Sequence, residues 1–459
     1  MNQHHESHLV RKGVCLNTEL HFRNIKCTSD MEKVLTVEMQ IAERSRKNPK
    51  AALTNLHQFI DEVMLAESFA GLNKKGASGV DAETWHDYER QKGERIPELL
   101  KAFKSGRYKA PHIRRTYIPK GDGKMRPPGI PTTEDKILQS AVKRVLTPVY
   151  EQIFYPVSHG FRTGKSQHQA LEEVFKEVSF KGKRYIIDAD MQNYFGTINH
   201  QRLREFLDQR VNDGVIRKMI DKWLKAGVLE EGMVAYPREG TPQGGTISPL
   251  LSNVYLHYVL DEWFIELVQP LLRGESFLIR FADDFLLGFS NKEDALRVLE
   301  VLPKRLGKYG LTLHAEKTKL IELDEAKEEG EKTFDFLGLT HYMGKSLKGN
   351  RILKRKTSSK KFSGAMKRMN EWIKENRHGI IAGIIAELNL KLRGHYVYYG
   401  ITFNSRKIRS YYEQTKRLLF KWLNRRGGKR INWEEYTELL KVIPLDKPKI
   451  YHKNHLAKP

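Results

Sequence analysis

Two short apolar runs with a pair of acids between them dominate the hydrophobic pattern in the middle of the chain. Residues 277–279 and 286–289 are apolar and of strand length, and Asp283 and Asp284 stand between them. This pattern predicts two buried strands joined by a tight turn that exposes both carboxylates. Asp favours turns for its own hydrogen-bonding reasons, so the pair taken alone is typical of a solvated turn. Together with further acids, it would let a rigid element hold carboxylates for metal ions.

A third predicted strand also ends in acid. Residues 185–187 form a β-branched and aromatic run, and Asp188 and Asp190 follow it. The pattern predicts a strand that delivers a carboxylate at its C-terminal end, which makes Asp190 a candidate third acid. Asp188 lies on the same face of the strand, because side chains two residues apart point the same way. Spacing alone therefore keeps both candidates.

Short helices and strands alternate along the first 340 residues. A basic hairpin is expected at residues 115–131, and Ser166 is expected to N-cap a helix whose apolar positions share one face. The apolar positions of that helix are Leu171, Val174, Phe175 and Val178. Elsewhere, periodicity predicts helices at residues 31–72, 200–227 and 299–309, a helix from the 241–249 loop towards Trp263, a short strand at 311–314 and a hairpin arm at 334–339.

Positive charge is concentrated at the C-terminal end. The net charge of the 459 residues is +24, and residues 341–459 carry 29 Lys and Arg against 8 Asp and Glu. The periodicity there predicts a helix at residues 408–422, with an apolar face opposite Arg409, Lys416, Arg417 and Lys421. A basic helical region beside a nearly neutral body predicts a polyanion partner, with nucleic acid favoured over a membrane surface.

Composition excludes several classes of protein. No apolar run reaches the roughly 20 residues of a membrane span, and the first thirty residues lack the apolar core of a signal peptide. Cys15 and Cys27 are the two cysteines of the chain, so neither a disulfide framework nor a zinc site is expected. We therefore expect a folded cytoplasmic protein, associated with the nucleoid of a bacterial cytosol, with no membrane partner.

Five sequence blocks stand in the order in which they occur in reverse transcriptases. They are the hairpin of residues 115–131, Asp190 with Tyr194-Phe195, the Gln243-Gly244 loop, Phe281-Ala282-Asp283-Asp284, and Phe336-Leu337-Gly338. Each block alone is weak evidence, but five in order form a strong match. Over residues 72–426 the chain resembles group II intron reverse transcriptase/maturases in particular. This resemblance also rests on Gly160-Phe161-Arg162-Thr163-Gly164-Lys165-Ser166, Ser248-Pro249-Leu250-Leu251-Ser252-Asn253 and Leu392-Arg393-Gly394-His395-Tyr396.

The resemblance implies a fold, a division into domains and a function. The implied fold is α+β, a right-hand polymerase with fingers, a palm built on an antiparallel sheet, and an α-helical thumb that doubles as the maturase element. We expect a mobile extension at residues 1–30, fingers and palm at 31–345, and the thumb/maturase domain with a short tail at 346–459. The implied function is RNA-directed DNA polymerisation with assistance to intron splicing and retrohoming. Its partners would be an RNA template, intron RNA, a DNA primer or target, and dNTPs.

The resemblance also assigns site residues. By motif alignment the catalytic, metal-binding acids are Asp190, Asp283 and Asp284, and Asp188 falls just outside the matched position. Three carboxylates can hold two Mg²⁺ ions about 3.5–4 Å apart. The residues implied to contact the dNTP are Lys124, Arg126, Phe195, Gln243 and Lys317. The residues implied to contact template or primer are Gly244, Gly338, Arg393, Arg409 and Lys416.

Several of these assignments compete with simpler explanations. Lys124 and Arg126 could belong to a solvated basic hairpin, and Gln243 and Gly244 to a plain helix-entry turn. The resemblance places the Phe195 ring under the deoxyribose, where it would exclude a 2′-hydroxyl, but the residue pattern alone favours a core Phe. Lys317 could contact the primer end or the triphosphate, whereas an isolated Lys is normally a surface residue.

Three functional hypotheses remain open from the sequence. Little chain follows Lys429, so we expect the endonuclease-lacking type of intron protein. The same observation fits a free-standing reverse transcriptase recruited to DNA repair or phage defence. The third hypothesis is an RNA-binding splicing factor that polymerises nothing, and the intact Asp190, Asp283 and Asp284 argue against it.

Overall fold

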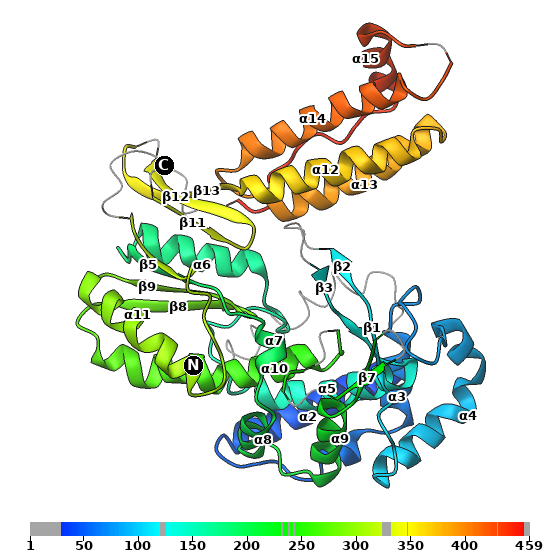
Figure 1. Cartoon of the computed structure of the whole chain (residues 1–459), viewed down its shortest axis with the longest axis vertical. Helices are drawn as coiled ribbons and strands as arrows, with labels where there is room; N and C mark the ends of the chain where they lie inside the picture. The colour runs from blue at the N-terminus through cyan, green and yellow to red at the C-terminus, as the bar shows by residue number, and fades with distance from the viewer. Residues whose placement is uncertain are drawn as a thin grey trace, which may run out of the picture.

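A four-stranded antiparallel sheet lies in the middle of the α+β fold (Figure 1). In the computed structural model, the described residues are 29–119, 125–230, 233–236, 239–241, 244–323, 332–346, 348–428 and 430–453. The strands of this sheet, in spatial order, are β10 (Lys319–Glu322), β5 (Tyr185–Ala189), β9 (Asp284–Phe289) and β8 (Ser276–Phe281). The strands expected at residues 185–187, 277–279 and 286–289 are confirmed.

Both faces of this sheet are buried because consecutive side chains alternate between two hydrophobic clusters. Ile186 packs against α6 (Gln167–Ser179), whereas Ile187 faces the larger cluster on the side of α11 (Lys292–Gly307). The predicted N-cap is confirmed, since Ser166 forms a capping box with Gln169. The strand ends are thus held by a core on each side of the sheet.

Helix α6 is shared between two sheets. Its apolar face contacts the central sheet and also a three-stranded antiparallel sheet, in which the β11–β12 hairpin turns at Leu337 and Gly338. Both turn residues have positive φ, as a two-residue type I′ turn requires. The strands of the second sheet are β11 (Thr333–Phe336), β12 (Leu339–Lys345) and β13 (Arg351–Thr357).

The N-terminal part of the described chain is mainly helical around a small sheet of order β4-β1-β6-β7 and a β2–β3 hairpin. The basic hairpin is confirmed as β1 (Ile113–Arg115) pairing with β4 (Gly129–Ile130), and β2 (Ile118–Pro119) pairing with β3 (Met125–Arg126). The other strands are β6 (Val228–Glu230) and β7 (Met233–Ala235). The remaining helices before the central hairpin are α2 (Ser29–Lys47), η1 (Leu56–Phe59), α3 (Glu62–Ala70), α4 (Trp85–Lys104), α5 (Thr133–Tyr150), α7 (Tyr194–Thr197), α8 (His200–Asp208), α9 (Gly214–Leu224) and α10 (Ser248–Leu256), with η2 (His257–Asp261), η3 (Trp263–Val268) and η4 (Gln269–Leu271).

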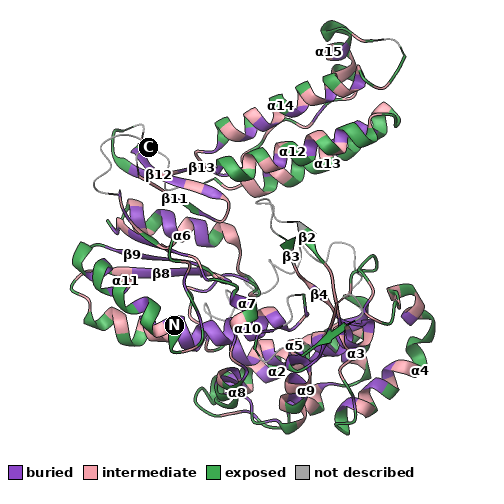
Figure 2. Ribbon diagram, in the orientation of Figure 1, coloured by how far each residue is buried: buried purple, intermediate pink, exposed green. Residues whose placement is uncertain are grey.

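The C-terminal region is helical, as expected, and lies at the opposite end of the molecule from α2–α5 (Figure 1). Its buried faces meet in a hydrophobic cluster of their own, and Figure 2 shows exposed residues along the outer faces of α12 and α13. The chain after α15 returns to the body, where His452 forms a β-bridge with Ile401. The helices are α12 (Ser359–Asn376), α13 (Ile381–Tyr399), α14 (Ser405–Leu423) and α15 (Trp433–Val442). In the described part of the chain, no helix combines the length and apolarity needed to cross a bilayer.

Some expected elements differ from the structure. The strand expected at residues 311–314 is wrong. Leu313 makes a single bridge, to Met191, because the chain after β5 turns away into α7 and offers no longer edge to pair with. The helix expected over 200–227 is divided into α8 and α9, and β10 was missed. The extension expected at residues 1–30 lies almost wholly outside the described residues.

Buried neutral histidine predicts a loss of stability in acid. Burial, reinforced by the positive charge of Arg355, lowers the pKa of His341 to about 3. The contribution of His341 to the free energy of unfolding is complete above pH 6.5, because the imidazole is then neutral in both the folded and the unfolded state. It falls by up to about 1.4 kcal/mol per pH unit below that, as the unfolded chain alone takes up the proton. The urea midpoint of the His341→Phe variant should depend less steeply on pH between 6.5 and 4 than that of the wild type.

The exposed His378 provides the control for this measurement. His378→Gln should keep the pH dependence of the wild type. An unchanged slope in His341→Phe would contradict the assignment of acid sensitivity to this residue.

Candidate active site

Strand register brings the candidate acids together. β5 and β9 are antiparallel, and Ala189 pairs with Phe285 at the end of the ladder. The same register continued by one residue sets Asp190 opposite Asp284. Directly opposed residues of antiparallel strands have Cα atoms about 4.5–5.5 Å apart, so two distant segments deliver their carboxylates side by side.

The third acid stands on the turn between β8 and β9. Phe281 pairs with Asp284, so Ala282 and Asp283 form a two-residue hairpin tip. Ala282 is buried and has a φ of 59°, a conformation that side chains other than glycine adopt at a cost. Such strain is retained only where the surroundings fix the backbone.

A pocket of about 600 Å³ opens beside these acids. Its lining includes Asp188, Asp190 and Asp284, and it is completed by Glu316, Lys317, Lys319, Thr333, Phe334, Asp335, Thr340, Ser359 and Lys360. The lining therefore comes from the central sheet, the β11–β12 hairpin and the start of α12. Acidic and basic side chains line the same open cavity.

The acids of the pocket raise one another's pKa. Desolvation, followed by repulsion from Asp283 and Asp190, raises the pKa of Asp284 to about 6. Desolvation, followed by repulsion from Asp284, raises the pKa of Asp188 to about 7, while Lys319 opposes the change. Asp284 stands at the exposed start of β9 and lines the pocket. Bringing these carboxylates together has an electrostatic cost that a cation would offset.

Lys317 is the counter-charge nearest to one of the predicted acids. Its Nζ lies 2.5 Å from Oδ2 of Asp190, and the lysine side chain remains 59% exposed. The backbone supports this arrangement, because the N–H of His314 donates to the Asp190 carbonyl at 2.7 Å. Lys317 thus reaches the acidic site from the segment before β10, and its outer side faces solvent.

The donor set suits Mg²⁺ in chemistry, although the described residues contain no ready group of three His, Cys, Asp or Glu side chains placed for a metal ion. Mg²⁺ prefers carboxylate oxygens, and proteins usually hold it by one or two carboxylates together with water and substrate phosphates. Asp190 and Asp284 offer such oxygens on adjoining strand ends, and Asp283 follows on the tip. The Lys317 ammonium now occupies the position of a cation at Asp190.

Among the other residues expected at the dNTP, the structure describes the side chain of Phe195 alone. Phe195 is buried to all but 9% of its surface, and its ring packs edge to face on Tyr194 at 5.4 Å, so it serves the core whatever else it does. Lys124 and Gln243 lie outside the described residues. Arg126 belongs to β3, and its side chain lies outside the described part.

The two glycines expected at template or primer both approach other chain segments closely. Gly244 has a φ of 110°, and a Cβ there would lie 2.4 Å from the Gly129 carbonyl oxygen. Gly338 has a φ of 75°, and a Cβ there would lie 3.1 Å from the Tyr399 hydroxyl. A backbone contact within the protein therefore already requires the small size of Gly244, and the positive φ of the turn already favours glycine at Gly338.

The basic residues expected at the nucleic acid differ in their surroundings. Arg409 is exposed on α14. Arg393 is paired with Asp446 of the C-terminal tail at 2.7 Å, and the Lys416 ammonium lies 5.3 Å from the centre of the Trp433 ring. Arg393 and Lys416 thus have contacts within the C-terminal region.

Sequence reasoning missed several contributors to the pocket, among them Asp335 and Ser359. Asp335 lines it and adds to the repulsion on Asp188. Ser359, at the start of α12, lines it from the helical region. Asp335 alternates with buried Phe334 and Phe336 along β11, a pattern that could have predicted an acid on the open face of the strand.

Comparison with known proteins places the chain in a family. Residues 118–341 match the family model described as reverse transcriptase (RNA-dependent DNA polymerase), a range that contains all three acids. Protein YkfC of Escherichia coli (strain K12) is 32% identical over 307 residues, which cover 58% of this chain and 77% of YkfC. The group II intron-encoded protein LtrA of Lactococcus lactis subsp. cremoris is 35% identical over 242 residues, which cover 52% of this chain. The chain belongs to the group II intron-type reverse transcriptase/maturase family.

Coverage differs among the relatives of this reverse transcriptase-family chain. The match spans 39% of the length of LtrA. A 91 kDa protein in a cob intron of Schizosaccharomyces pombe is 39% identical over 171 residues, or 21% of its length. The expected resemblance is confirmed, and residues 118–341 contain the acids, Lys317 and the hairpin tip.

Backbone packing under the hairpin tip generates a prediction. A Cβ at Gly160 would lie 2.2 Å from the backbone nitrogen of Ala282, an atom that cannot move without displacing the tip. Gly160→Ala should lower the free energy of unfolding by about 1–3 kcal/mol, as overpacking generally does. Chemical denaturation measures the effect.

Gly93 supplies a matched control for this substitution. It lies inside α4, and a Cβ there meets nothing within 4 Å. Gly93→Ala should leave stability unchanged or increase it by about 0.5–1 kcal/mol. Equal stability of Gly160→Ala and the wild type would show that the tip is not confined as described.

Proposed function

We propose that the protein is an RNA-directed DNA polymerase that extends a DNA primer with dNTPs on an RNA template. The observation that carries the proposal is the strand register, which sets Asp190 beside Asp284 and next to Asp283 within a reverse transcriptase domain. Carboxylates from two segments almost a hundred residues apart repel each other in the absence of a cation. Their convergence is best explained by a site for divalent ions.

Asp190, Asp283 and Asp284 would hold two Mg²⁺ ions. When bound, the ions would lower the pKa of the primer 3′-hydroxyl and neutralise charge on the triphosphate and the leaving pyrophosphate. Lys317 is placed to exchange its contact with Asp190 for a triphosphate oxygen as substrate enters the pocket. Asp188 remains on the wall of the pocket, beside the proposed metal ligands.

The chain would be divided into the fingers, palm and thumb of a right-hand polymerase. We assign residues 31–345 to fingers and palm, and residues 346–459 to a thumb that also binds intron RNA. Support comes from the charge of the C-terminal helices and from the name of LtrA, a group II intron-encoded protein. The lining of the pocket by Ser359 and Lys360 supports a thumb that begins at the site. Assistance to splicing and retrohoming is the further part of this proposal.

Substitution of the acids tests the polymerase function. With a primed RNA template and Mg²⁺, Asp283→Asn and Asp190→Asn should each reduce dNTP incorporation by at least about 10²-fold, because each removes a charged ligand while preserving shape. Asp188→Asn should retain most activity. A gel assay of primer extension measures all three. Full activity of Asp190→Asn with loss in Asp188→Asn would transfer the role to Asp188, and inactive wild-type protein would reject the function.

Binding to RNA should be separable from chemistry. Affinity for a structured RNA should fall steeply with salt, and Asp283→Asn should bind as the wild type does. Arg409→Ala should weaken binding and reduce the slope of log affinity against log salt by about 1, as loss of one phosphate contact does. Lys92→Ala, on α4, is the control and should change neither. Salt-independent binding by the wild type would contradict a phosphate-gripping C-terminal region.

A further inference from the structure

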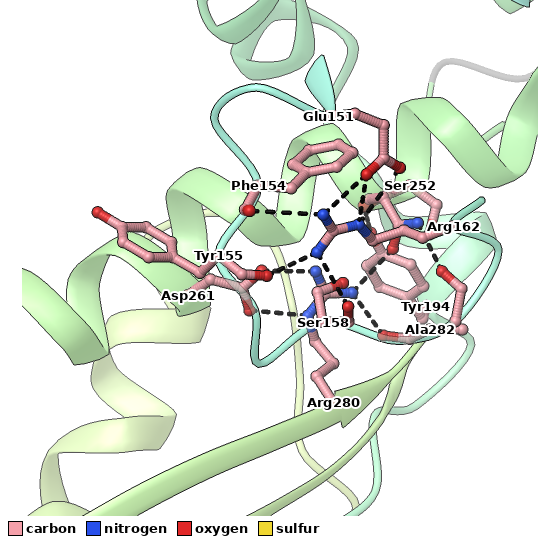
Figure 3. Close-up of polar contacts among 12 residues, drawn as sticks. Glu151, Phe154, Tyr155, Ser158, Arg162, Tyr194, Ser252, Asp261, Arg280 and Ala282 are labelled. Carbon is pink, nitrogen blue, oxygen red and sulfur yellow. Dashed lines mark hydrogen bonds and ion pairs between the residues drawn. The ribbon is translucent and has the colours of Figure 1, made fainter. Parts of the chain in front are cut away.

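A fully buried ion pair lies directly beneath the hairpin tip. Arg280 is the second residue before Ala282 on β8, and its side chain and that of Asp261 are both 0% exposed. The guanidinium Nε lies 2.7 Å from Oδ1 of Asp261, and Nη2 lies 2.5 Å from Oδ2 (Figure 3). This bidentate geometry fixes the plane of the guanidinium.

The third nitrogen of the guanidinium is directed at the tip itself. Nη1 donates to the Ala282 carbonyl at 2.9 Å and to Oδ1 of Asn253 on α10, also at 2.9 Å. Asn253 in turn donates from Nδ2 to the Gly160 carbonyl at 2.8 Å. Gly160 also contacts the tip directly, since its backbone lies against the Ala282 nitrogen. The strained residue is thereby contacted on both its carbonyl side and its amide side.

The loop that carries Gly160 is shaped by a second arginine. Arg162 contacts Glu151 through Nε and Nη2, and its Nη1 donates to the carbonyls of Tyr155 and Ser158 (Figure 3). The backbone of Arg280 pairs with the same loop through Val157 at 2.8 Å. The loop that carries Gly160 and strand β8 are therefore joined by hydrogen bonds next to the tip.

We infer that Arg280 is a positioning residue for the acids, held in place by Asp261 and Asn253. The inference rests on the proposed polymerase function. Apolar residues of similar volume would stabilise a core at least as well as a buried ion pair does, so stability alone does not explain the pair. Apolar residues could not donate to the Ala282 carbonyl. That hydrogen bond holds the positive φ of Ala282 and thereby the direction in which Asp283 and Asp284 leave the tip.

The helix that delivers Asp261 supports this role. Asp261 ends η2 (His257–Asp261), a π-helical segment that continues α10. Wide π turns are rare in proteins, and those that occur are often found at functional sites. Within this segment Asp261 is fully buried against Arg280, whereas neighbouring Glu262 is half-buried. Local helix geometry is thus irregular at the residue that anchors the guanidinium.

A double substitution separates positioning from stability. Arg280→Met with Asp261→Leu removes both charges and fills the space, so the thermal midpoint should stay near that of the wild type. We expect kcat for dNTP incorporation to fall by about 10²-fold, the effect of a misplacement of about 1 Å, with an unchanged Kd for primer–template. Hydrogen exchange of the peptide covering residues 281–285 should accelerate by about tenfold.

Two further variants complete the experiment. Asn253→Leu leaves the ion pair intact and should lower kcat by about 3–10-fold with faster exchange at the tip, so it decides the question if the double variant does not fold. Arg210→Met removes a buried arginine that contacts the carbonyls of Asn48, Pro49 and Ala51, far along the chain from the tip. It should lower stability and leave exchange at residues 281–285 unchanged.

The outcomes separate this inference from the proposed function. A folded double variant, or failing that a folded Asn253→Leu variant, with wild-type kcat and wild-type exchange at the tip would overturn the positioning role. Wild-type protein that incorporates no dNTP would reject the polymerase, and the exchange measurement would still decide whether Arg280 holds the tip.

Discussion

The antiparallel register of β5 against β9 is the constraint on which the site depends. It sets the end of one strand, at Asp190, opposite the beginning of the other, at Asp284. A shift by one residue would turn the side chains to the other face of the sheet. The two hydrophobic clusters on either side of the sheet prevent that shift, because Ile186 and Ile187 each have a different apolar environment to fill. The location of the carboxylates is therefore a consequence of core packing.

Bringing the acids together costs electrostatic free energy, and neighbouring groups in the structure offset part of it. Desolvation and then repulsion raise the pKa of Asp284, while Lys317 contributes an opposite charge at Asp190. The turn is also strained, since Ala282 holds a positive φ where glycine would be easier. Both features are local weaknesses that a rigid scaffold must offset. The buried guanidinium of Arg280 and the backbone of Gly160 are the parts of that scaffold in direct contact with the tip.

Much of this was predictable from the sequence. Short apolar runs on both sides of Asp283-Asp284 and before Asp190 specify strands that are buried on both faces. Ser166 marks the start of its helix, which it caps in a capping box. The charge of the C-terminal region is a property of composition. The run at 311–314 was misassigned because a strand needs a partner edge, and the edge offered after β5 is one residue long. β10, half exposed, was too weakly patterned to recognise.

The amino-acid order by itself determined which residues are acidic, where the chain turns, and which family it belongs to, because these follow from short-range pattern and from motif order. Tertiary structure alone decided that Asp335 shares the pocket, that Arg393 is engaged by Asp446, and that Arg280 is paired within the core instead of facing solvent. The two ion pairs join residues 19 and 53 positions apart, Asp335 lies 147 positions from Asp188 on the wall of the same pocket, and nothing in the local pattern encodes the partner of a charge. Pairing across such distances is set by the packing of sheets and helices around a shared core.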